Sequence, residues 1–290
     1  MDFSEFLMAN GEDKLCGVMQ SGDYSLSDAF SGRLSQYLWQ YYYVGGMPEV
    51  VCSFVRKGDL NEVRSLQSDI LDAYRMDIAK HTDKTESVRI GQVLSSLPSQ
   101  LARENRRFIY GAARKGGRAA DFEVAIQWLV DAGLVYRVDR VSKVSVPLRF
   151  YEDLGAFKLF FLDVGLLCRM SDVPASVVLG EDEGLKEFKG MLAEEYVAQQ
   201  LSAAGMELFY WSNDRTPAEL DFVIQYGSEA YPIEVKSGTN VRGKSIAQYV
   251  KDNPGKKGFR FSMLGYCEQD WLTNIPLYAV PFWAVNRHPL

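Results

Sequence analysis

Asp221, Glu234 and Lys236 stand inside a stretch that otherwise reads as two apolar strands joined by a turn, ELDFVIQYGSEAYPIEVKSG at residues 219–238. Buried charges are costly unless they pair with one another or bind a metal. A divalent ion held by Asp221 and Glu234 would polarise a phosphoryl oxygen and lower the pKa of a bound water, while Lys236 would stabilise developing negative charge. The spacing therefore predicts a catalytic metal site.

Strand alternation gives these side chains a common direction, because every second residue of a strand faces the same side. It predicts apolar residues on one face and charged residues on the other: Leu220, Phe222 and Ile224 against Glu219 and Asp221 in the first strand, and Ile233 and Val235 against Glu234 and Lys236 in the second. The preceding helix adds Glu194, which we expect to point toward the sheet because it shares a stripe with Val197, Ala198 and Leu201.

The predicted roles follow from the chemistry of these groups. Converging carboxylates repel one another unless a cation or a proton compensates them. Asp221 and Glu234 would be the metal ligands, the Val235 carbonyl a candidate third ligand, Glu194 an outer ligand among the catalytic residues, and Lys236 the catalytic cation. The structural alternative is a salt-bridged hairpin in which Lys236 neutralises Asp221 or Glu234.

Oxygen ligands are the ones this sequence offers to a metal. The four cysteines are scattered without CxxC spacing, and the sequence contains two histidines. This excludes a Cys/His zinc module and disfavours a disulfide scaffold. Carboxylate and carbonyl oxygens select magnesium, manganese or calcium, and we expect magnesium or manganese here.

Positive charge is concentrated in two stretches, although the net charge is −6. Residues 84–118 hold eight basic side chains against two acidic ones, and residues 236–260 hold seven against one. Such patches on an acidic protein are compatible with nucleic acid binding or with ordinary solvated loops. The predicted nucleic-acid-binding residues, with DNA as the expected ligand, are Arg103, Arg106, Arg107, Arg114, Lys115 and Arg118.

Periodicity divides the chain into three expected domains. Residues 1–75 read as helices, with Leu34, Leu38 and Tyr41 at helical spacing and Pro48 suited to a first turn. Residues 76–170 predict a helix ending near Pro98, a helix near 119–132, and two strands, the second of them FKLFFLDVGLL. This order is that of a winged helix-turn-helix with residues 119–132 as recognition helix, a module that binds DNA or protein.

Residues 171–290 predict a third domain. A small and acidic linker, MSDVPASVVLGEDEG, is followed by the helix LKEFKGMLAEEYVAQQLSAAG and the strand MELFYWS. The charged strand pair comes next, then a helix at KSIAQYVKDN, a strand at GFRFSML and a last strand near PLYAVPFWAV. The succession predicts an α/β unit with a mixed sheet, so the whole chain is expected to be an α+β multidomain protein of the α/β class.

The last domain resembles the PD-(D/E)xK nuclease superfamily, which has the restriction-endonuclease-like fold. Asp221, Glu234 and Lys236 match its motif and Glu194 its helix position. The larger arrangement is similar to the C-terminal portion of bacterial and archaeal AAA-like ATPases that carry a domain of unknown function. The phrases that carry this likeness are FSEFL, GGMPEVV, YRMDIAKH, FKGMLAEEYV, ELDFVI and PIEVKSG, which together span nearly the whole chain.

The resemblance implies a nucleic-acid-associated function. Its enzymatic form is metal-dependent DNA cleavage, and its alternatives are an inactive nuclease-fold scaffold for DNA or an ATPase partner, or a structural tail of that ATPase. Those ATPases carry a P-loop core ahead of this region, whereas GxxxxGK[ST] occurs nowhere in this sequence and GAARKGGR is no substitute. We therefore expect a separated or degenerate C-terminal half that does not bind ATP.

A cytoplasmic location without a membrane partner is expected. The N-terminal residues MDFSEFLMANGED are acidic and lack the basic region of a signal peptide. The richest apolar stretch, LGAFKLFFLDVGLLC, is too short to span a bilayer and is interrupted by Lys158 and Asp163.

Overall fold

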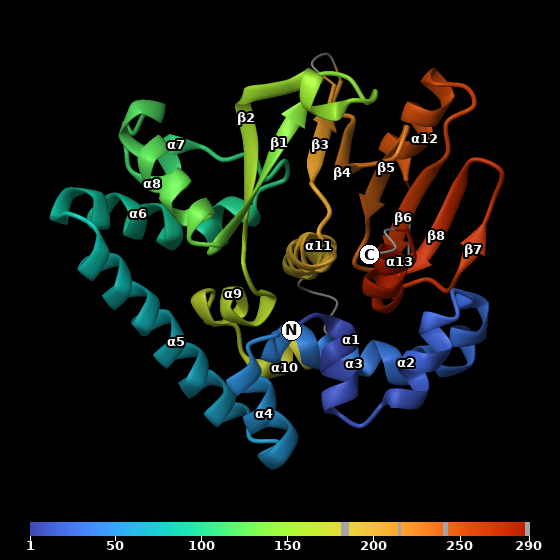
Figure 1. Cartoon of the computed structure of the whole chain (residues 1–290), viewed down its shortest axis with the longest axis horizontal. Coiled ribbons are helices and arrows are strands. Elements are labelled where there is room, and N and C mark those ends of the chain that lie inside the picture. Colours follow the sequence, from blue (N-terminus) through green and yellow to red (C-terminus); the bar gives the residue numbers. More distant parts are fainter. Residues whose placement is uncertain (181–185, 214–215, 240–242, 288–290) are drawn as a thin grey trace.

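The computed structural model shows a helical N-terminal region followed by an eight-stranded mixed sheet with interspersed helices (Figure 1). The structure describes residues 1–180, 186–213, 216–239 and 243–287. Part of the expected acidic linker, residues 181–185, and Arg242 of the second basic stretch lie outside the described residues.

The N-terminal region is helical, as the apolar spacing predicts. Asp59 and Asp83 cap two of its helices by accepting hydrogen bonds from backbone N–H groups of the first turn. The helices, one of them a short 3₁₀ turn, are α1 (Phe3–Ala9), α2 (Asp13–Gln20), η1 (Tyr24–Phe30), α3 (Ser31–Val44), α4 (Pro48–Lys57), α5 (Leu60–His81) and α6 (Lys84–Leu101).

A short helix, a longer helix and a strand pair come next, and three further helices follow the strand pair. The elements are α7 (Tyr110–Ala113), α8 (Ala119–Asp131), β1 (Val135–Val141), η2 (Leu148–Tyr151), β2 (Glu152–Phe161), α9 (Val164–Met170), α10 (Ala175–Leu179) and α11 (Lys186–Ala203). The remaining elements are β3 (Phe209–Ser212), β4 (Glu219–Tyr226), β5 (Glu229–Val235), α12 (Lys244–Asp252), β6 (Gly258–Ser262), β7 (Cys267–Glu268), β8 (Leu272–Pro276), η4 (Leu277–Ala279) and α13 (Val280–Arg287).

One sheet runs across the expected boundary at residues 170 and 171. Its strand order is β2-β1-β3-β4-β5-β6-β8-β7. β1 pairs with β2 antiparallel and with β3 parallel, so the strand pair of the middle region extends the sheet of the last region. The division into domains at 1–75, 76–170 and 171–290 stays a prediction.

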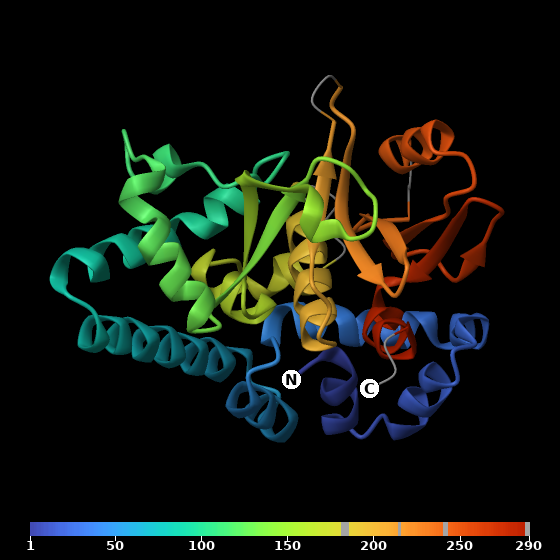
Figure 2. The same cartoon turned by 45° about the horizontal axis from the view of Figure 1, so that its top comes forward.

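Helix α11 occupies the middle of the molecule, between the strands and the N-terminal helices (Figures 1 and 2). Its residues Tyr196, Val197 and Leu201 are fully buried in the larger apolar cluster. The opposite face of the sheet carries a second cluster, in which Ile246 and Tyr249 of α12 cover Val223 of β4. The sheet is therefore buried on both faces, and charged side chains within it must find internal partners.

A close approach of two glycine-containing turns joins α3 to α9. Asp163, the N-cap of α9, accepts a hydrogen bond from the Gly46 N–H at 2.6 Å and another from the Leu166 N–H. A Cβ at Gly165 would lie 2.5 Å from the backbone nitrogen of Gly45. The glycines of GGMPEVV are therefore required by packing. They leave room for the Asp163 carboxylate, whose hydrogen bond to Gly46 connects the N-terminal helices to α9.

Four expectations about secondary structure are wrong. The last residues of two predicted strands, 164–167 of FKLFFLDVGLL and 280–285 of PLYAVPFWAV, lie in the helices α9 and α13. Both runs are almost continuously apolar, so periodicity cannot separate a buried strand from a buried helix. Helix α6 continues through Pro98 to Leu101, because burial of Leu97 and Leu101 outweighs the loss of one backbone hydrogen bond. The expected linker contains the helix α10.

Candidate functional site

A β-bulge sets the position of Asp221. Phe209 and Trp211 of β3 pair with Val223 and Leu220 of β4, so one residue of β3 lies opposite two residues of β4, Asp221 and Phe222. The expectation that Leu220 shares a face with Phe222 is consequently wrong, since Leu220 belongs to the second apolar cluster and Phe222 to the first. Bulges commonly redirect a side chain beside a functional site.

The structure brings all four predicted site residues to one cavity of about 1020 Å³. Asp221 of β4, Glu234 of β5, Lys236 just beyond β5 and Glu194 of α11 all line it. The three carboxylates among them are at most 9% exposed. The helix and the two strands therefore concentrate negative charge at one place.

The Asp221 carboxylate is fixed by the neighbouring strand. Its Oδ2 accepts a hydrogen bond of 2.7 Å from the backbone N–H of Val235. This bond joins β4 to the end of β5 beyond their last paired residues, Phe222 and Ile233. Asp221 is thus held beside Glu234 by backbone geometry rather than by a flexible contact.

Glu234 is paired through one oxygen and unpaired through the other. Lys236 Nζ lies 3.3 Å from Glu234 Oε1, and the buried Oε2 has no hydrogen-bond partner within the described chain. A Cβ at Gly243 would lie 2.5 Å from Oε2, so glycine leaves room for this oxygen at the start of α12. Burial raises the pKa of Glu234, and Lys236 opposes the rise.

Glu194 shows the same half-paired state. Its Oε1 lies 2.8 Å from Arg106 Nη1, whereas its buried Oε2 finds no partner among the described residues. Burial, followed by repulsion from Asp221, raises the pKa of Glu194 to about 7, against the opposing charges of Arg106 and Lys158. This carboxyl therefore changes charge near neutral pH when no further cation is present.

The sequence pattern did not identify one cation of the acidic cluster, Lys158. Lys158 of β2 is fully buried, and its Nζ lies 2.5 Å from Glu219 Oε1 and 4.8 Å from the centre of the Tyr210 ring. Burial lowers the pKa of Lys158, but the charges of Glu219, Glu194 and Asp221 outweigh burial and raise it. The available signal was a lysine inside the apolar run FKLFF, which we interpreted only as an interruption.

The acidic residues fit a divalent cation in donor chemistry but are not already arranged as a metal cage. No group of three or more His, Cys, Asp or Glu side chains in the described residues stands in metal-binding geometry. Two buried carboxylate oxygens beside Asp221, Oε2 of Glu234 and Oε2 of Glu194, nevertheless have no hydrogen-bond partner among the residues that the structure describes. Hard cations such as magnesium take such oxygens together with several waters. A third ligand at the Val235 carbonyl stays a prediction.

The predicted basic residues divide into two groups. Arg103, Arg106 and Arg107 line the acidic cavity, and Arg140 of β1 joins them there. The other three predicted residues, Arg114, Lys115 and Arg118, are not among the residues that line this cavity. Arg114 is bound elsewhere, with its Nη2 3.1 Å from Asp121 Oδ2.

Three described residues of the second basic stretch have partners within the protein. Lys236 lines the acidic cavity and pairs with Glu234. Arg260 is buried and donates a hydrogen bond to the Asn274 side chain. Lys256 Nζ lies 3.5 Å from Glu229 Oε2.

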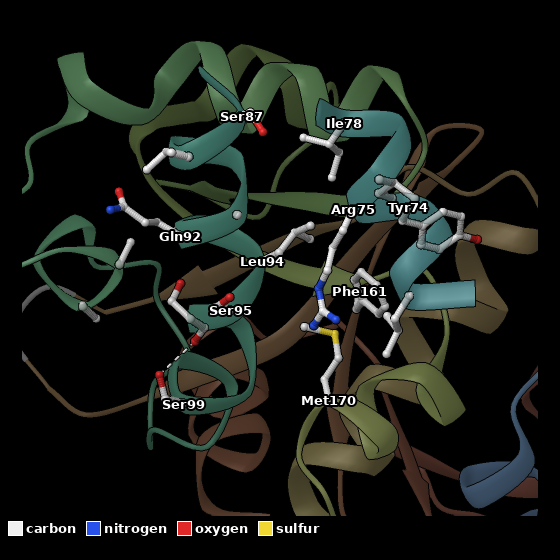
Figure 3. A pocket seen from close by; sticks show the side chains of 17 residues that line it. Tyr74, Arg75, Ile78, Ser87, Gln92, Leu94, Ser95, Ser99, Phe161 and Met170 are labelled. Carbon is white, nitrogen blue, oxygen red and sulfur yellow. Dashed lines mark hydrogen bonds between the residues drawn. The ribbon is translucent and has the colours of Figure 1, made fainter. Parts of the chain in front are cut away.

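A second cavity, of about 520 Å³, lies between α5 and α6 (Figure 3). Tyr74 and Arg75 enter it from α5, Leu94 from α6, and Phe161 and Met170 from β2 and α9. The described residues that line it include no carboxylate. It therefore offers a mainly apolar space with one cation, and the acidic cavity remains the candidate site for metal chemistry.

A pH-dependent stability difference is expected from Glu194. Its carboxyl binds a proton more tightly in the folded chain than in the unfolded chain, so it stabilises the fold fully at pH below about 4.5, and this contribution is lost as pH rises to about 7. Glu194→Gln has no such proton. In metal-free buffer the free energy of unfolding of the parent chain should fall by roughly 3 kcal/mol relative to Glu194→Gln over this range. Urea titrations at several pH values measure it, and a constant difference would contradict the burial of an ionisable Glu194.

None of the described helices combines the length and the apolar character needed to cross a membrane.

Two models of domains of unknown function match the chain. The first, Domain of unknown function (DUF8612), matches residues 35–177, and the second, Domain of unknown function (DUF4143), matches residues 189–278. DUF4143 is commonly found C-terminal to AAA ATPases in bacteria. Glu194, Asp221, Glu234 and Lys236 fall within the second match, whereas Arg106 and Lys158 fall within the first. Neither a curated protein nor a solved structure gives a significant match.

Proposed function

We propose that the chain cleaves phosphodiester bonds of DNA with the help of magnesium or manganese at the acidic cavity. The observation that carries the proposal is the convergence of Asp221, Glu234 and Lys236 with Glu194, where two buried carboxylate oxygens have no partner among the described residues. Three arginines on the same cavity wall, Arg103, Arg106 and Arg107, supply the complement to a phosphate backbone.

The fold proposal follows from the same residues. We propose that α11 and the strands from β3 onward form a restriction-endonuclease-like unit, and that α6 to β2 form a winged helix. The element order supports both, since α11 precedes the strand pair that carries Asp221 and Glu234, and α8 precedes the β1–β2 pair. Nucleic acid as a partner is part of this proposal.

Each side chain has a distinct role in the proposed reaction. Asp221 and Glu234 would hold the cation, and Glu194 would act on its outer side. A bound divalent ion polarises the phosphoryl oxygen and lowers the pKa of a coordinated water. Lys236, 36% exposed and beside Glu234, would orient the attacking water and stabilise negative charge that grows on the phosphate. Arg103 and Arg107 would fix the register of the backbone.

An ATPase partner is the second part of the proposed function. The DUF4143 match supports it, because such domains commonly follow AAA ATPases in bacteria. The chain itself contains no GxxxxGK[ST] sequence, so ATP binding would belong to the partner.

An inactive interaction module is the competing proposal, and internal charge pairing favours it. Lys236 pairs with Glu234, Arg106 with Glu194, and Lys158 with Glu219, so several carboxylates already have a protein cation. Such a module would keep the fold and bind DNA or an ATPase partner without turnover.

Cleavage of supercoiled plasmid separates the two proposals. The active form predicts nicking that requires Mg²⁺ or Mn²⁺ and stops with a chelator. Asp221→Asn should lose both metal binding, measured by calorimetry, and nicking, because it removes one ligand charge. Asp252→Asn, at an exposed position of α12, is the matched control. Metal that raises the melting temperature without any nicking would reject the enzyme and favour the module.

A further inference from the structure

Arg106 lines the acidic cavity and has a strained backbone conformation. Its φ is 49°, in the left-handed region that a residue with a Cβ seldom adopts. A bulky residue persists there only when the surrounding structure holds it. The surroundings do hold it, because the N–H groups of Phe108 and Ile109 donate to the Phe157 carbonyl at 2.8 Å and to Gln100 Oε1 at 2.6 Å.

The Arg106 side chain is buried against one carboxylate and is incompletely bonded there. It is 14% exposed, and its Nη1 lies 2.8 Å from Glu194 Oε1. Arg106 Nε and Glu194 Oε2 are both buried and have no partner within the described chain. An arginine and a carboxylate usually satisfy each other through two parallel hydrogen bonds. This pair leaves one donor and one acceptor unused, which indicates that each group can accept another partner.

The neighbouring residues indicate what the other partner of Arg106 is. Arg103 and Arg107 line the same cavity, and Arg107 Nη2 donates to the Gly155 carbonyl rather than to a carboxylate. Three arginines that line one cavity attract an anion with several acceptor oxygens, and a phosphodiester backbone is such an anion. Asp221 repels both Glu194 and Glu234, so a cation is the ligand that would stabilise Glu194.

We propose that Arg106 serves as an internal counter-ion of Glu194 in the free protein and transfers to a DNA phosphate when substrate and metal bind together. This inference rests on the proposed function in that it takes the cavity to bind both ligands. Moving Arg106 alone leaves a buried carboxylate without a partner, which is strongly unfavourable. The divalent ion replaces Arg106 as the cation beside Glu194, and the phosphate replaces Glu194 as the anion beside Arg106. Each ligand therefore strengthens the binding of the other by the same factor.

The consequence is a cation site that is weak until nucleic acid arrives. Arg106 belongs to the region matched by the first domain and Glu194 to the region matched by the second, so the pair also links the two. Metal uptake would then report the presence of substrate, and free protein would hold little metal.

The coupling is measured with Mn²⁺ and a 12-base-pair DNA duplex as probes. Mn²⁺ affinity is determined by electron paramagnetic resonance with and without saturating duplex, and duplex affinity by fluorescence anisotropy with and without Mn²⁺; gels verify that the duplex stays intact. In the parent chain we expect each ligand to tighten the other about tenfold. In Arg106→Gln, Mn²⁺ should bind the free protein about tenfold more tightly and duplex should no longer change its affinity.

Two further variants keep the test decisive. Arg106→Gly suits the left-handed backbone and should reproduce the Arg106→Gln result even where glutamine is poorly tolerated. Arg107→Gln lowers duplex affinity but should keep the tenfold coupling, because Arg107 has no contact with Glu194. Binding of both ligands without coupling in the parent chain, or equal coupling in the Arg106 variants, overturns this inference and leaves the proposed function standing. Failure of the parent chain to bind Mn²⁺ at all overturns both.

Discussion

Lys236→Ala is expected to slow metal-dependent nicking of plasmid DNA by about 10²–10³-fold, the loss seen when one preorganised donor to a developing negative charge is removed. Mn²⁺ affinity should stay within about threefold of the parent value, because Lys236 is not among the proposed ligands. The measurement is the initial nicking rate at saturating Mn²⁺, together with a Mn²⁺ titration of the same preparation.

Lys251→Ala is the matched control for this variant, since Lys251 is an exposed lysine of α12 and does not line the acidic cavity. It should nick at the parent rate. A parent-like rate in Lys236→Ala would show that Lys236 only neutralises Glu234. The salt-bridged hairpin would then replace the catalytic interpretation.

Lys158→Met is expected to destabilise the fold by about 3–5 kcal/mol. Lys158 is fully buried and Glu219 is 20% exposed, so the change leaves a largely buried carboxylate without its cation. Burial raises the pKa of Glu219, and loss of the opposing Lys158 charge raises it further. Urea denaturation at pH 7 gives the change in the free energy of unfolding.

The double variant Lys158→Met/Glu219→Leu distinguishes the effect of an uncompensated charge on stability from the effect of altered packing. Replacing both members of a buried ion pair by apolar residues is often neutral or stabilising, so most of the lost stability should return. If the double variant is as unstable as the single one, the loss comes from packing around β2 rather than from an uncompensated charge.

The location of the acidic site follows directly from sequence spacing. Asp221 and Glu234 lie on consecutive strands joined by a short turn, so one hairpin brings them near each other, although the alternation predicted for β4 fails at Leu220. Glu194 follows from the apolar stripe of its own helix. These are contacts between neighbouring elements, and a linear pattern predicts them well.

The counter-ions of the site could not be predicted in the same way. Lys158 reaches Glu219 because β1 pairs in parallel with β3, and no local pattern reveals which distant strands become neighbours. Arg106 reaches Glu194 through a strained turn whose φ is set by tertiary contacts. The bulge beside Asp221 was missed for a related reason, since it depends on the register between β3 and β4.

The position of a bound cation decides whether Asp221 and Glu234 form a metal site. A crystal soaked in Mn²⁺ and measured at the manganese absorption edge would give an anomalous difference map. We expect a peak at about 2.1–2.4 Å from carboxylate oxygens of Asp221 and Glu234, stronger when a DNA duplex is bound and absent in Asp221→Asn. A crystal with bound duplex and saturating Mn²⁺ that shows no peak between Asp221 and Glu234 would contradict the metal site.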